Sequence, residues 1–515
     1  METKETVQTT LTRSRISKDL ADAIKQRSGE QSAVKTFKVI IECNLDFLGG
    51  LHGARDTLFR AYRQTPEGKR DANSYQELSQ PIISPREIGL LVKTFKDGDR
   101  VDIGKSLWTD SYVFANLTKG TIDKLSNWST GGTRIVYKIW LDHKLERCVY
   151  ESVRTIKCDA ARASFAAAGK GIVWALADTG VDGQHSHFTV HETLSLDGIL
   201  FHHDFTENHS TERESSAAAL VDGDGHGTHV AGIIAGRTTI KRSGSIKKIT
   251  VRTNEENEDQ TSTSVDRPFK DEIAGLAPYC KILSLKVLKN AEEGDLSSLI
   301  AAIGFIQRMN DNGRKLRIHG LNISLGYSFD PVSYAAGQSP LCVEVDRLVR
   351  SGVCVVVAAG NAGYGTVTQH TGGIERATHL GTIMDPGNAA LAVTVGSTHR
   401  DRPHSYGVSY FSSKGPTADG RMKPDIVAPG ERIISCDAKV TPAKGEVRFR
   451  EDSGTSMAAP HVSGAIAAFL SVRAEFLGQP ERVKELFMAG ATDLKRRPEF
   501  QGAGLIDLMR TLQAV

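Results

Sequence analysis

One apolar stretch constrains the fold of this chain more than any other segment. Residues 171–180 read GIVWALADTG, so an uninterrupted apolar run leads to Asp178 and then to a turn. A run without polar alternation is typical of a strand that is buried on both faces of a parallel sheet. In such sheets, functional groups lie at the carboxyl ends of the strands. The stretch therefore predicts an α/β domain with Asp178 at the functional edge of its sheet.

A second segment, residues 454–461 with the sequence GTSMAAPH, contains a serine, Ser456, in a setting that suits a nucleophile. Gly454 leaves room for a substrate to approach the backbone. The apolar residues from Met457 onward predict a buried helix that opens at Ser456. The free N–H groups and the positive end of that helix would face any negative charge formed beside Ser456. Pro460 is expected near the helix start, where a missing N–H group costs least.

A serine nucleophile requires a general base and a third group that orients the base. His226 lies in the segment DGHGTHVAG, residues 224–232, between two glycines that leave its imidazole accessible. The apolar run behind it predicts a helix. Asp178, His226 and Ser456 therefore form a candidate triad of carboxylate, base and nucleophile.

With these residues in place, the chain resembles the subtilisin-like serine endopeptidases, the subtilase family. The order of its triad, Asp before His before Ser, is that of subtilisin. Matching motifs run in register from about Ile156 to the C-terminus: ALADTGVD, GHGTHVAG, GLAPYCKILSLKVL, LNISLG, VVVAAGNAG, FSSKGPTADGRMKPDIVAPG and GTSMAAPHVSG. The resemblance implies a subtilisin-like α/β fold with a mostly parallel sheet and helices on both faces. It also implies peptide hydrolysis through an acyl-enzyme.

Asn361 follows the apolar strand expected at residues 353–360. An asparagine at such a place often does no more than tolerate a left-handed turn. The resemblance assigns Asn361 instead as an oxyanion-hole donor that acts with the backbone N–H of Ser456.

The resemblance also implies two walls of a substrate site. One wall pairs with an extended substrate as an added strand, and it comprises Ser324, Leu325 and Gly326. The other wall bounds the main specificity pocket and comprises Ala358, Ala359 and Gly360. The side chains of both walls are small. Met384 is expected near the floor of the pocket, where it would make the pocket shallower. No acidic residue is evident at the floor. These features predict a broad preference for large apolar residues on the acyl side of the cut, rather than for Lys or Arg.

Composition excludes several other classes of protein. The net charge of +3 over 515 residues gives no sign of nucleic-acid or membrane binding. No apolar run reaches the roughly 18 residues of a membrane span, and the polar N-terminus does not resemble a secretory signal. The 7 scattered cysteines do not form a disulfide framework. Cytoplasmic residence is expected, and secretion stays open because a chain that had lost its signal would look the same.

No cofactor is expected for the chemistry; a structural calcium ion stays an open alternative, but no site for it is recognised. Many subtilases bind a structural calcium ion in the region that corresponds to residues 237–272, but the short Asn/Gly loop of that site is not recognisable here. This charged insertion is basic in its first half and acidic in its second. It is interpreted as a solvated surface loop of the kind that is often mobile. Four histidines lack the spacing typical of a zinc site: His185, His187, His202 and His203.

The first 145 residues carry no subtilase motif. Residues 1–32 are interpreted as a flexible tail, residues 33–145 as an α+β domain, and residues 146–515 as the catalytic domain. Expected strands are 36–42, 90–94, 112–117 and 134–142, and expected helices are 51–63 and 118–125. This order is similar to that of a ferredoxin-like subtilase prodomain. Such a domain would inhibit the enzyme within the same chain, with the link 142–150 crossing the active site; the alternative is an unrelated partner-binding domain.

The leading function is therefore that of a serine endopeptidase acting on protein or peptide substrates, with no nucleic-acid or membrane partner. A rival from another class is a non-catalytic binding or regulatory protein on the same fold. Loss of a triad residue would favour this rival, and none is lost from the sequence. A third hypothesis is an enzyme kept silent by its N-terminal domain until a partner releases it.

Overall fold

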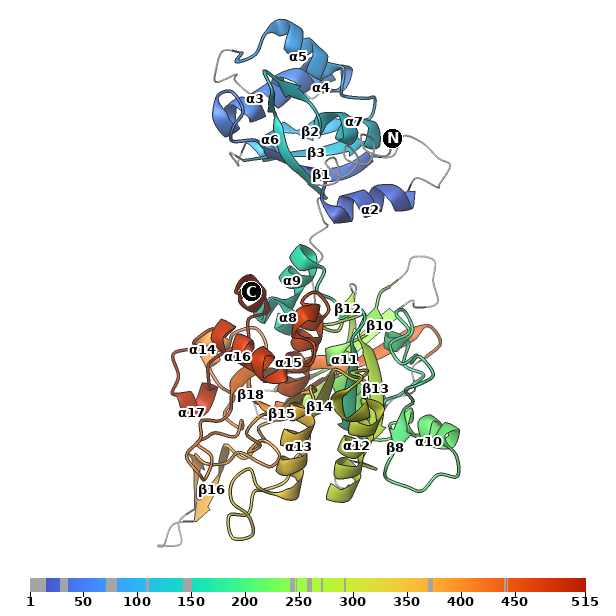
Figure 1. Cartoon of the computed structure of the whole chain (residues 1–515), viewed down its shortest axis with the longest axis vertical. Helices are drawn as coiled ribbons and strands as arrows, with labels where there is room; N and C mark the ends of the chain where they lie inside the picture. Colours follow the sequence, from blue (N-terminus) through green and yellow to red (C-terminus); the bar gives the residue numbers. More distant parts are fainter. Residues whose placement is uncertain are drawn as a thin grey trace. The chain divides into compact units, whose positions relative to one another are not determined.

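The computed structural model describes residues 15–27, 36–70, 81–107, 111–141, 151–240, 246, 248–256, 262–269, 272–290, 293–368, 374–439, 441 and 443–515. The chain divides into two compact units, Met1–Leu145 and Glu146–Val515, whose elements are labelled in Figure 1. The link 142–150 lies outside the described residues, so its expected passage through the active site stays a prediction.

The N-terminal unit packs helices against an antiparallel sheet of four strands in the order β2-β3-β1-β6. Val39 and Ile41 of β1 are buried in one core with Leu58 and Phe59 of α3, because each element has one apolar face to cover. The strands are β1 (Thr36–Cys43), β2 (Arg100–Asp102), β3 (Tyr112–Thr118), β4 (Ser129–Thr130), β5 (Thr133–Arg134) and β6 (Val136–Leu141). The helices are α2 (Lys18–Arg27), α3 (Gly50–Arg63), α4 (Pro66–Arg70), α5 (Pro85–Val92), α6 (Ile103–Ser106) and α7 (Lys119–Leu125).

The strand expected at residues 90–94 is wrong, because this segment begins within helix α5. The backbone N–H of Glu87 donates to the Ser84 hydroxyl, and the Glu87 carboxylate accepts from the Ser84 N–H at 2.9 Å. This capping box starts a helix that the apolar residues alone did not indicate.

The interpretation of residues 1–32 as a flexible tail is wrong for helix α2. Ile16, Leu20 and Ile24 recur at every fourth position and are buried in the core of the N-terminal unit. The charged residues between them concealed an apolar stripe with helical spacing.

The C-terminal unit is built on a parallel sheet of seven strands in the order β19-β18-β15-β14-β7-β13-β8. Its strands are β7 (Val173–Asp178), β8 (His203–Asp204), β13 (Lys281–Lys286), β14 (Gly320–Ile323), β15 (Cys354–Ala358), β18 (Val393–His399) and β19 (Ile426–Glu431). The helices are α8 (Glu151–Thr155), α9 (Cys158–Phe165), α10 (Glu212–Ala219), α11 (His226–Ile234), α12 (Leu296–Met309), α13 (Pro340–Arg350), α14 (Pro403–Tyr406), α15 (Thr455–Leu470), α16 (Pro480–Gly490), α17 (Pro498–Gln501) and α18 (Leu508–Gln513). Short 3-10 turns are η1 (Ser186–Phe188), η2 (Asp311–Gly313) and η3 (Ala474–Phe476).

Strand β7 is covered on both of its faces. Trp174 and Leu176 lie in the core that contains α11 and α15, whereas Ala175 and Ala177 lie in the core that contains α12 and α13. Figure 1 shows α12 and α13 side by side below the sheet. Two covered faces account for the uninterrupted apolar run of this strand. The expected α/β architecture, with a mostly parallel sheet between helices, is confirmed.

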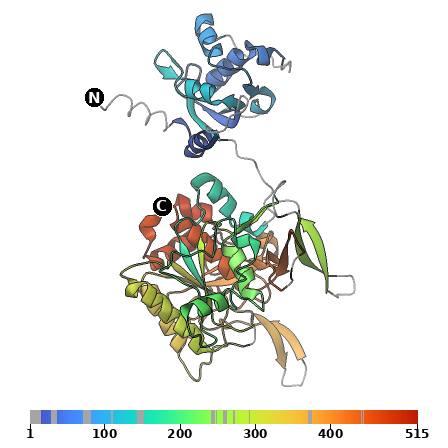
Figure 2. The same cartoon turned by 90° about the vertical axis from the view of Figure 1, so that its right-hand side faces the viewer.

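The smaller strands of this unit lie outside the main sheet. They are β9 (Arg237–Thr238), β10 (Lys248–Glu256), β11 (Ser262–Phe269), β12 (Ile273–Ala274), β16 (Tyr364–Thr368), β17 (Ile374–Thr378), β20 (Ile433–Cys436) and β21 (Glu446–Asp452). Figure 2 shows the β10–β11 hairpin in green and the β16–β17 hairpin in orange as projecting arms.

The described part of the insertion 237–272 corrects its interpretation as a solvated loop. Strands β10 and β11 pair antiparallel, and β10 also pairs in parallel with β21. Ile249 and Val251 of β10 lie in the same buried core as Val447 and Phe449 of β21. On β21, Arg448 alternates with the buried Val447 and Phe449 and keeps 22% of its side chain exposed, as the two-residue period of a strand requires.

Among the helices of the described residues, none combines the length and the apolarity that crossing a membrane requires.

Candidate active site

Asp178 and His226 are brought together by the ends of two elements. Asp178 is the last residue of β7 and is 1% exposed, and His226 is the first residue of α11. The Oδ1 atom of Asp178 lies 2.7 Å from Nδ1 of His226. The N–H of Thr179 donates to the same oxygen at 2.8 Å. This pairing occupies one nitrogen of the imidazole and directs the other, Nε2, away from Asp178.

A buried carboxylate, Asp222, shapes the turn that presents His226. It accepts from the N–H groups of Gly225 and Thr228 at 2.7 and 2.8 Å. It also accepts from the hydroxyls of Thr228 and Thr179 at 2.6 and 2.9 Å. Burial raises the pKa of Asp222 against the effect of these hydrogen bonds, which lower it. Because Thr179 adjoins Asp178, this one side chain ties the strand of the carboxylate to the turn of the histidine.

The protonation of His226 results from competing effects. Burial lowers its pKa, but the charge and hydrogen bond of Asp178, together with the charges of Asp452 and Asp222, raise the pKa of His226 to about 9. The side chain keeps 23% of its surface exposed, so a substrate can reach its outer edge. The surroundings therefore stabilise the imidazolium form, as a base that carries a proton during a reaction requires.

Ser456 is the second residue of α15, the helix that packs against α11. Its hydroxyl donates to the carbonyl oxygen of Ser324 at 2.9 Å. Among the described residues, no hydrogen bond joins Ser456 to His226. The structure thus joins Asp178 to His226 directly and places Ser456 on the adjoining helix, with its hydroxyl turned toward Ser324.

Pro460 lies well inside α15 rather than near its start, which corrects the expectation from the sequence. Its missing N–H leaves the carbonyl of Ser456, four residues earlier, without a helical donor. The Ser324 hydroxyl supplies that donor at 2.9 Å. Asn322 donates to the Ser324 hydroxyl at 2.8 Å and accepts from the Ser463 hydroxyl at 2.9 Å. A buried polar chain therefore links α15 to the end of β14 and to Ser324, the residue that follows it.

Asn361 is oriented by Thr455. Its Oδ1 atom accepts from the Thr455 N–H at 2.9 Å and from the Thr455 hydroxyl at 3.0 Å, which leaves Nδ2 on the opposite side of the amide. A Cβ atom built on Gly454 would lie 3.5 Å from Asn361 Nδ2 and 3.6 Å from the backbone nitrogen of Ser456. Two nitrogen donors therefore border the space that the missing side chain of Gly454 leaves open.

The two expected substrate walls follow neighbouring parallel strands, β14 and β15. The first wall, Ser324 to Gly326, comes directly after β14. The second wall comprises the last residue of β15, Ala358, with Ala359 and Gly360. The N–H of Met384 donates to the Ala359 carbonyl at 3.0 Å, and a Cβ on Gly360 would lie 2.6 Å from the Met384 sulfur. Met384 therefore packs closely on the second wall.

A cavity of about 400 Å³ lies beside the first wall. Its lining is mostly aliphatic and includes Leu288, Leu296, Leu299, Leu325 and Leu341. These leucines come from separate parts of the chain, so no local pattern in the sequence indicated the cavity.

Several supporting residues were missed from the sequence. Asn322 carried one usable signal, because a polar residue inside an apolar strand is usually hydrogen-bonded when buried. Asp222 carried no distinct signal: three of its four hydrogen bonds come from Gly225 and Thr228 nearby in the sequence, and the bond from Thr179 depends on a tertiary contact. Thr455 has no signal beyond its place before Ser456.

Two of the four histidines, His187 and His202, are buried and hydrogen-bonded. His187 Nδ1 lies 2.9 Å from the Thr238 hydroxyl oxygen, and His202 Nε2 lies 3.0 Å from the Leu194 carbonyl oxygen. Burial lowers the pKa of both histidines. Within the described ranges, no group of three or more His, Cys, Asp or Glu side chains is placed to hold a metal ion.

Comparisons with known proteins show to which family the chain is similar. The model of the subtilase family matches residues 169–504. The chain is 31% identical to pyrolysin of Pyrococcus furiosus over 318 residues, covering 56% of this chain and 21% of pyrolysin. It is 28% identical to the serine protease AprX of Bacillus subtilis over 351 residues, covering 66% of this chain and 65% of AprX.

A third relative is an intracellular serine protease of Paenibacillus polymyxa, 29% identical over 345 residues, covering 66% of this chain and 80% of the relative. The chain thus spans only part of these relatives, and less than two thirds of the length of pyrolysin and of AprX. Because the family model covers well over half of its residues, the chain belongs to the subtilase family.

Proposed function

We propose that this chain is a serine endopeptidase that cleaves peptide bonds through Asp178, His226 and Ser456. The observation that carries the proposal is the 2.7 Å contact between Asp178 Oδ1 and His226 Nδ1. It lies at the carboxyl end of β7, and the helix of Ser456 packs against the helix of His226. Membership of the subtilase family supports the same assignment, as do two relatives named as serine proteases.

In the proposed reaction, the Ser456 hydroxyl turns from the Ser324 carbonyl to His226 Nε2, a change between staggered side-chain positions. His226 takes the hydroxyl proton as the Ser456 oxygen attacks the scissile carbonyl carbon. Asp178 holds the imidazole with its proton on Nδ1 and stabilises the imidazolium. His226 then protonates the leaving amine, and a water molecule activated by His226 releases the acid from the acyl-enzyme.

The negative charge of the tetrahedral intermediate would lie beside Gly454. Asn361 Nδ2 and the Ser456 N–H would donate to it, and the positive end of α15 would add to their effect. Thr455 supports this role because it fixes the Asn361 amide through the oxygen rather than the nitrogen. No cofactor takes part in the proposed chemistry.

An extended substrate would pair with Ser324 to Gly326 as an added strand. The side chain before the cut would enter between this wall and Ala358 to Gly360, with Met384 limiting the depth of the pocket. A second apolar side chain of the substrate would enter the cavity beside Leu325. These apolar surroundings support the broad preference for large apolar residues before the cut.

We also propose that the N-terminal unit inhibits the enzyme within the same chain, with processing in the link 142–150. An α+β unit with an antiparallel sheet, directly preceding the C-terminal unit, supports this role. Action in the cytoplasm is proposed as well. Its support is the naming of two relatives, from Paenibacillus polymyxa and Bacillus subtilis, as intracellular serine proteases.

Digestion of denatured casein tests the proposed activity. The wild-type chain should release peptides cut after large apolar residues, whereas Ser456→Ala should release none above background. Ser453→Ala is a matched control. The Ser453 hydroxyl accepts a hydrogen bond from the Arg432 N–H at 2.9 Å, and it is not one of the proposed catalytic or binding groups. Equal digestion by wild type and Ser456→Ala would contradict the proposal.

A further inference from the structure

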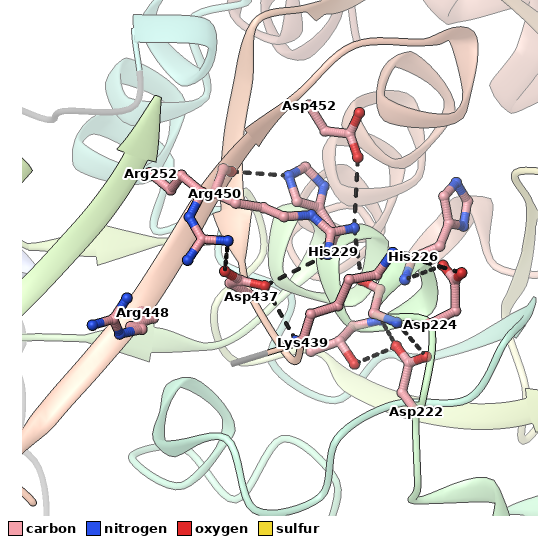
Figure 3. A network of polar contacts seen from close by, with 12 residues as sticks. Asp222, Asp224, His226, His229, Arg252, Asp437, Lys439, Arg448, Arg450 and Asp452 are labelled. Atoms are coloured by element: carbon pink, nitrogen blue, oxygen red, sulfur yellow. Dashed lines mark hydrogen bonds and ion pairs between the residues drawn. The ribbon is translucent and has the colours of Figure 1, made fainter. Parts of the chain in front are cut away.

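A series of charged side chains runs from the insertion toward the turn before His226 (Figure 3). Strands β10 and β21 pair in parallel with Arg252 opposite Arg450, so two guanidinium groups belong to neighbouring positions. Asp437, whose side chain is 1% exposed, lies near both groups. Its carboxylate is 4.0 Å from Arg252 Nη1 and 3.6 Å from Arg450 Nη1. One buried carboxylate therefore offsets the repulsion between two cations.

Arg450 connects this series to the turn that carries His226. Its Nη2 donates to the carbonyl oxygen of Gly225, the residue directly before His226, at 3.3 Å. Its own carbonyl oxygen lies 3.2 Å from Nε2 of His229, on the first turn of α11. One residue of β21 thus contacts α11 both at the residue that precedes it and within its first turn.

The contact with Gly225 depends on the absence of a side chain there. Gly225 has φ 84°, which favours glycine, and a Cβ atom would lie 2.8 Å from Arg450 Nη1. The glycine that frees the turn before His226 therefore also makes room for the guanidinium.

Charged and titratable groups approach His226 from several of the elements around it. Asp178 comes from β7, and Asp222 and Asp224 come from the turn before α11. Lys439, which follows β20, lies 3.7 Å from Asp224, and His229 lies on α11 itself.

From β21, Asp452 raises the pKa of His226, and Arg450 Nη2 lies 3.5 Å from the Asp452 carboxylate. Arg450 is therefore placed to offset one of the negative charges that act on His226.

We propose, on the basis of the proposed protease function, that Arg450 is a positioning residue for His226 and couples it to the inserted hairpin. Asp178 fixes the imidazole, whereas Arg450 fixes the backbone turn from which the imidazole extends and offsets Asp452. Asp437 and Arg252 hold Arg450 in place from the side of the hairpin. The insertion 237–272 would then tune the active site without touching the substrate.

The charges determine the sign of each expected change. Arg450→Met leaves Asp452 unopposed, so the pKa of His226 should rise and the acid limb of kcat/KM should move to higher pH, because the base must be neutral. Asp452→Asn should lower the pKa of His226 and move the acid limb of kcat/KM to lower pH. Arg252→Met should act in the same direction as Arg450→Met but less strongly, since it acts only through Asp437.

Arg448→Met is the matched control on the same strand. The Arg448 guanidinium pairs with Asp266 at 3.1 Å and with Glu446 at 3.5 Å, and neither carboxylate is among the main groups that raise the pKa of His226. Its removal should change neither the titration of His226 nor the acid limb of kcat/KM.

Two measurements on the full chain test the proposal. The His226 titration is followed by NMR with labelled histidine in a Ser456→Ala background, with assignment from His226→Gln, so this readout does not need activity. In the otherwise wild-type chain, Arg450→Met should lower kcat/KM roughly tenfold, mainly through kcat, because a small misplacement of a catalytic group is costly. If Arg450→Met does not fold, Asp452→Asn carries the test, because Asp452 is 38% exposed and its removal should be tolerated.

The outcomes separate the two proposals. Opposite shifts for Arg450→Met and Asp452→Asn, with no shift for Arg448→Met, would support the positioning role. An active chain in which all three variants titrate like the parent would overturn it. A wild-type chain that hydrolyses nothing, but in which the opposite shifts are seen, would contradict the protease function and leave the coupling standing.

Discussion

Asn361 offers the clearest test at the scale of a single side chain. Asn361→Ala removes the Nδ2 donor, while Thr455 and Gly454 stay in place. We expect kcat to fall by about 10²–10³, the size typical for losing one oxyanion donor, with little change in KM because the oxyanion exists only in the transition state. Steady-state kinetics on a peptide substrate measure both constants. A raised KM with unchanged kcat would show that Asn361 binds the substrate rather than the oxyanion.

Met384 is expected to limit which side chains enter the main specificity pocket. Met384→Ala removes the side chain that packs on Gly360, so the pocket should deepen and the preference should move from Leu toward Phe and Tyr. In an apolar pocket, each methylene group changes the discrimination between two substrate side chains by only about 1–3 kcal/mol. Profiling kcat/KM on a peptide library measures the change. Met422→Ala, at an exposed methionine, should leave the profile unaltered, and an identical profile for both variants would contradict the placement of Met384.

At the scale of elements, close packing of α11 on β7 brings Asp178 and His226 together. Gly227 makes this approach possible, since a Cβ atom there would lie 2.1 Å from the Gly180 carbonyl oxygen. Gly227→Ala should displace the start of α11 and lower kcat/KM by about 10², as misplacement of a catalytic group does. It should also lower Tm in thermal denaturation.

Gly223→Ala is the control for this prediction. Gly223 lies in the turn directly before α11, and a Cβ atom there would meet nothing within 4 Å. Activity and Tm should therefore stay close to the wild type. If Gly227→Ala behaved in the same way, the packing would not be what positions His226.

The elements also show how far the sequence alone predicts this structure. The buried run before Asp178 indicated the central strand, because it needs no knowledge of its partners. The β10–β11 hairpin was missed, because its charged residues suggested a loop and its partner β21 lies far later in the chain. Helix α5 was missed because its capping box, and not its apolar residues, marks its start. Motifs likewise indicated Asp178, His226, Ser456 and Asn361, but no motif indicated residues that act through tertiary contacts, such as Asp437.

At the scale of the whole molecule, the open point is how the two units act on each other. The N-terminal unit has a hydrophobic core of its own, so the fragment 1–145 should fold when expressed separately. If the unit is an inhibitor, the wild-type chain should be cut within the link 142–150 and the fragment should inhibit the processed enzyme. Ser456→Ala should stay uncut. Intact mass spectrometry and inhibition assays measure these outcomes.

A shorter fragment, 1–141, is the control, because it lacks the link that would enter the active site. It should inhibit less strongly than 1–145. A wild-type chain that stays intact while fully active, or a fragment 1–145 without effect, would favour the alternative role of partner recognition.

Ser456 is proposed to be an activated nucleophile, and covalent labelling reports on this reactivity at the residue itself. The folded, processed chain is treated with a serine-directed fluorophosphonate, and the modified residue is identified by peptide mapping with mass spectrometry. We expect the adduct on Ser456 in the wild type and in Ser453→Ala, and no adduct in Ser456→Ala. A folded, processed wild-type chain that takes no label, or takes it on another residue, would show that Ser456 is not the nucleophile.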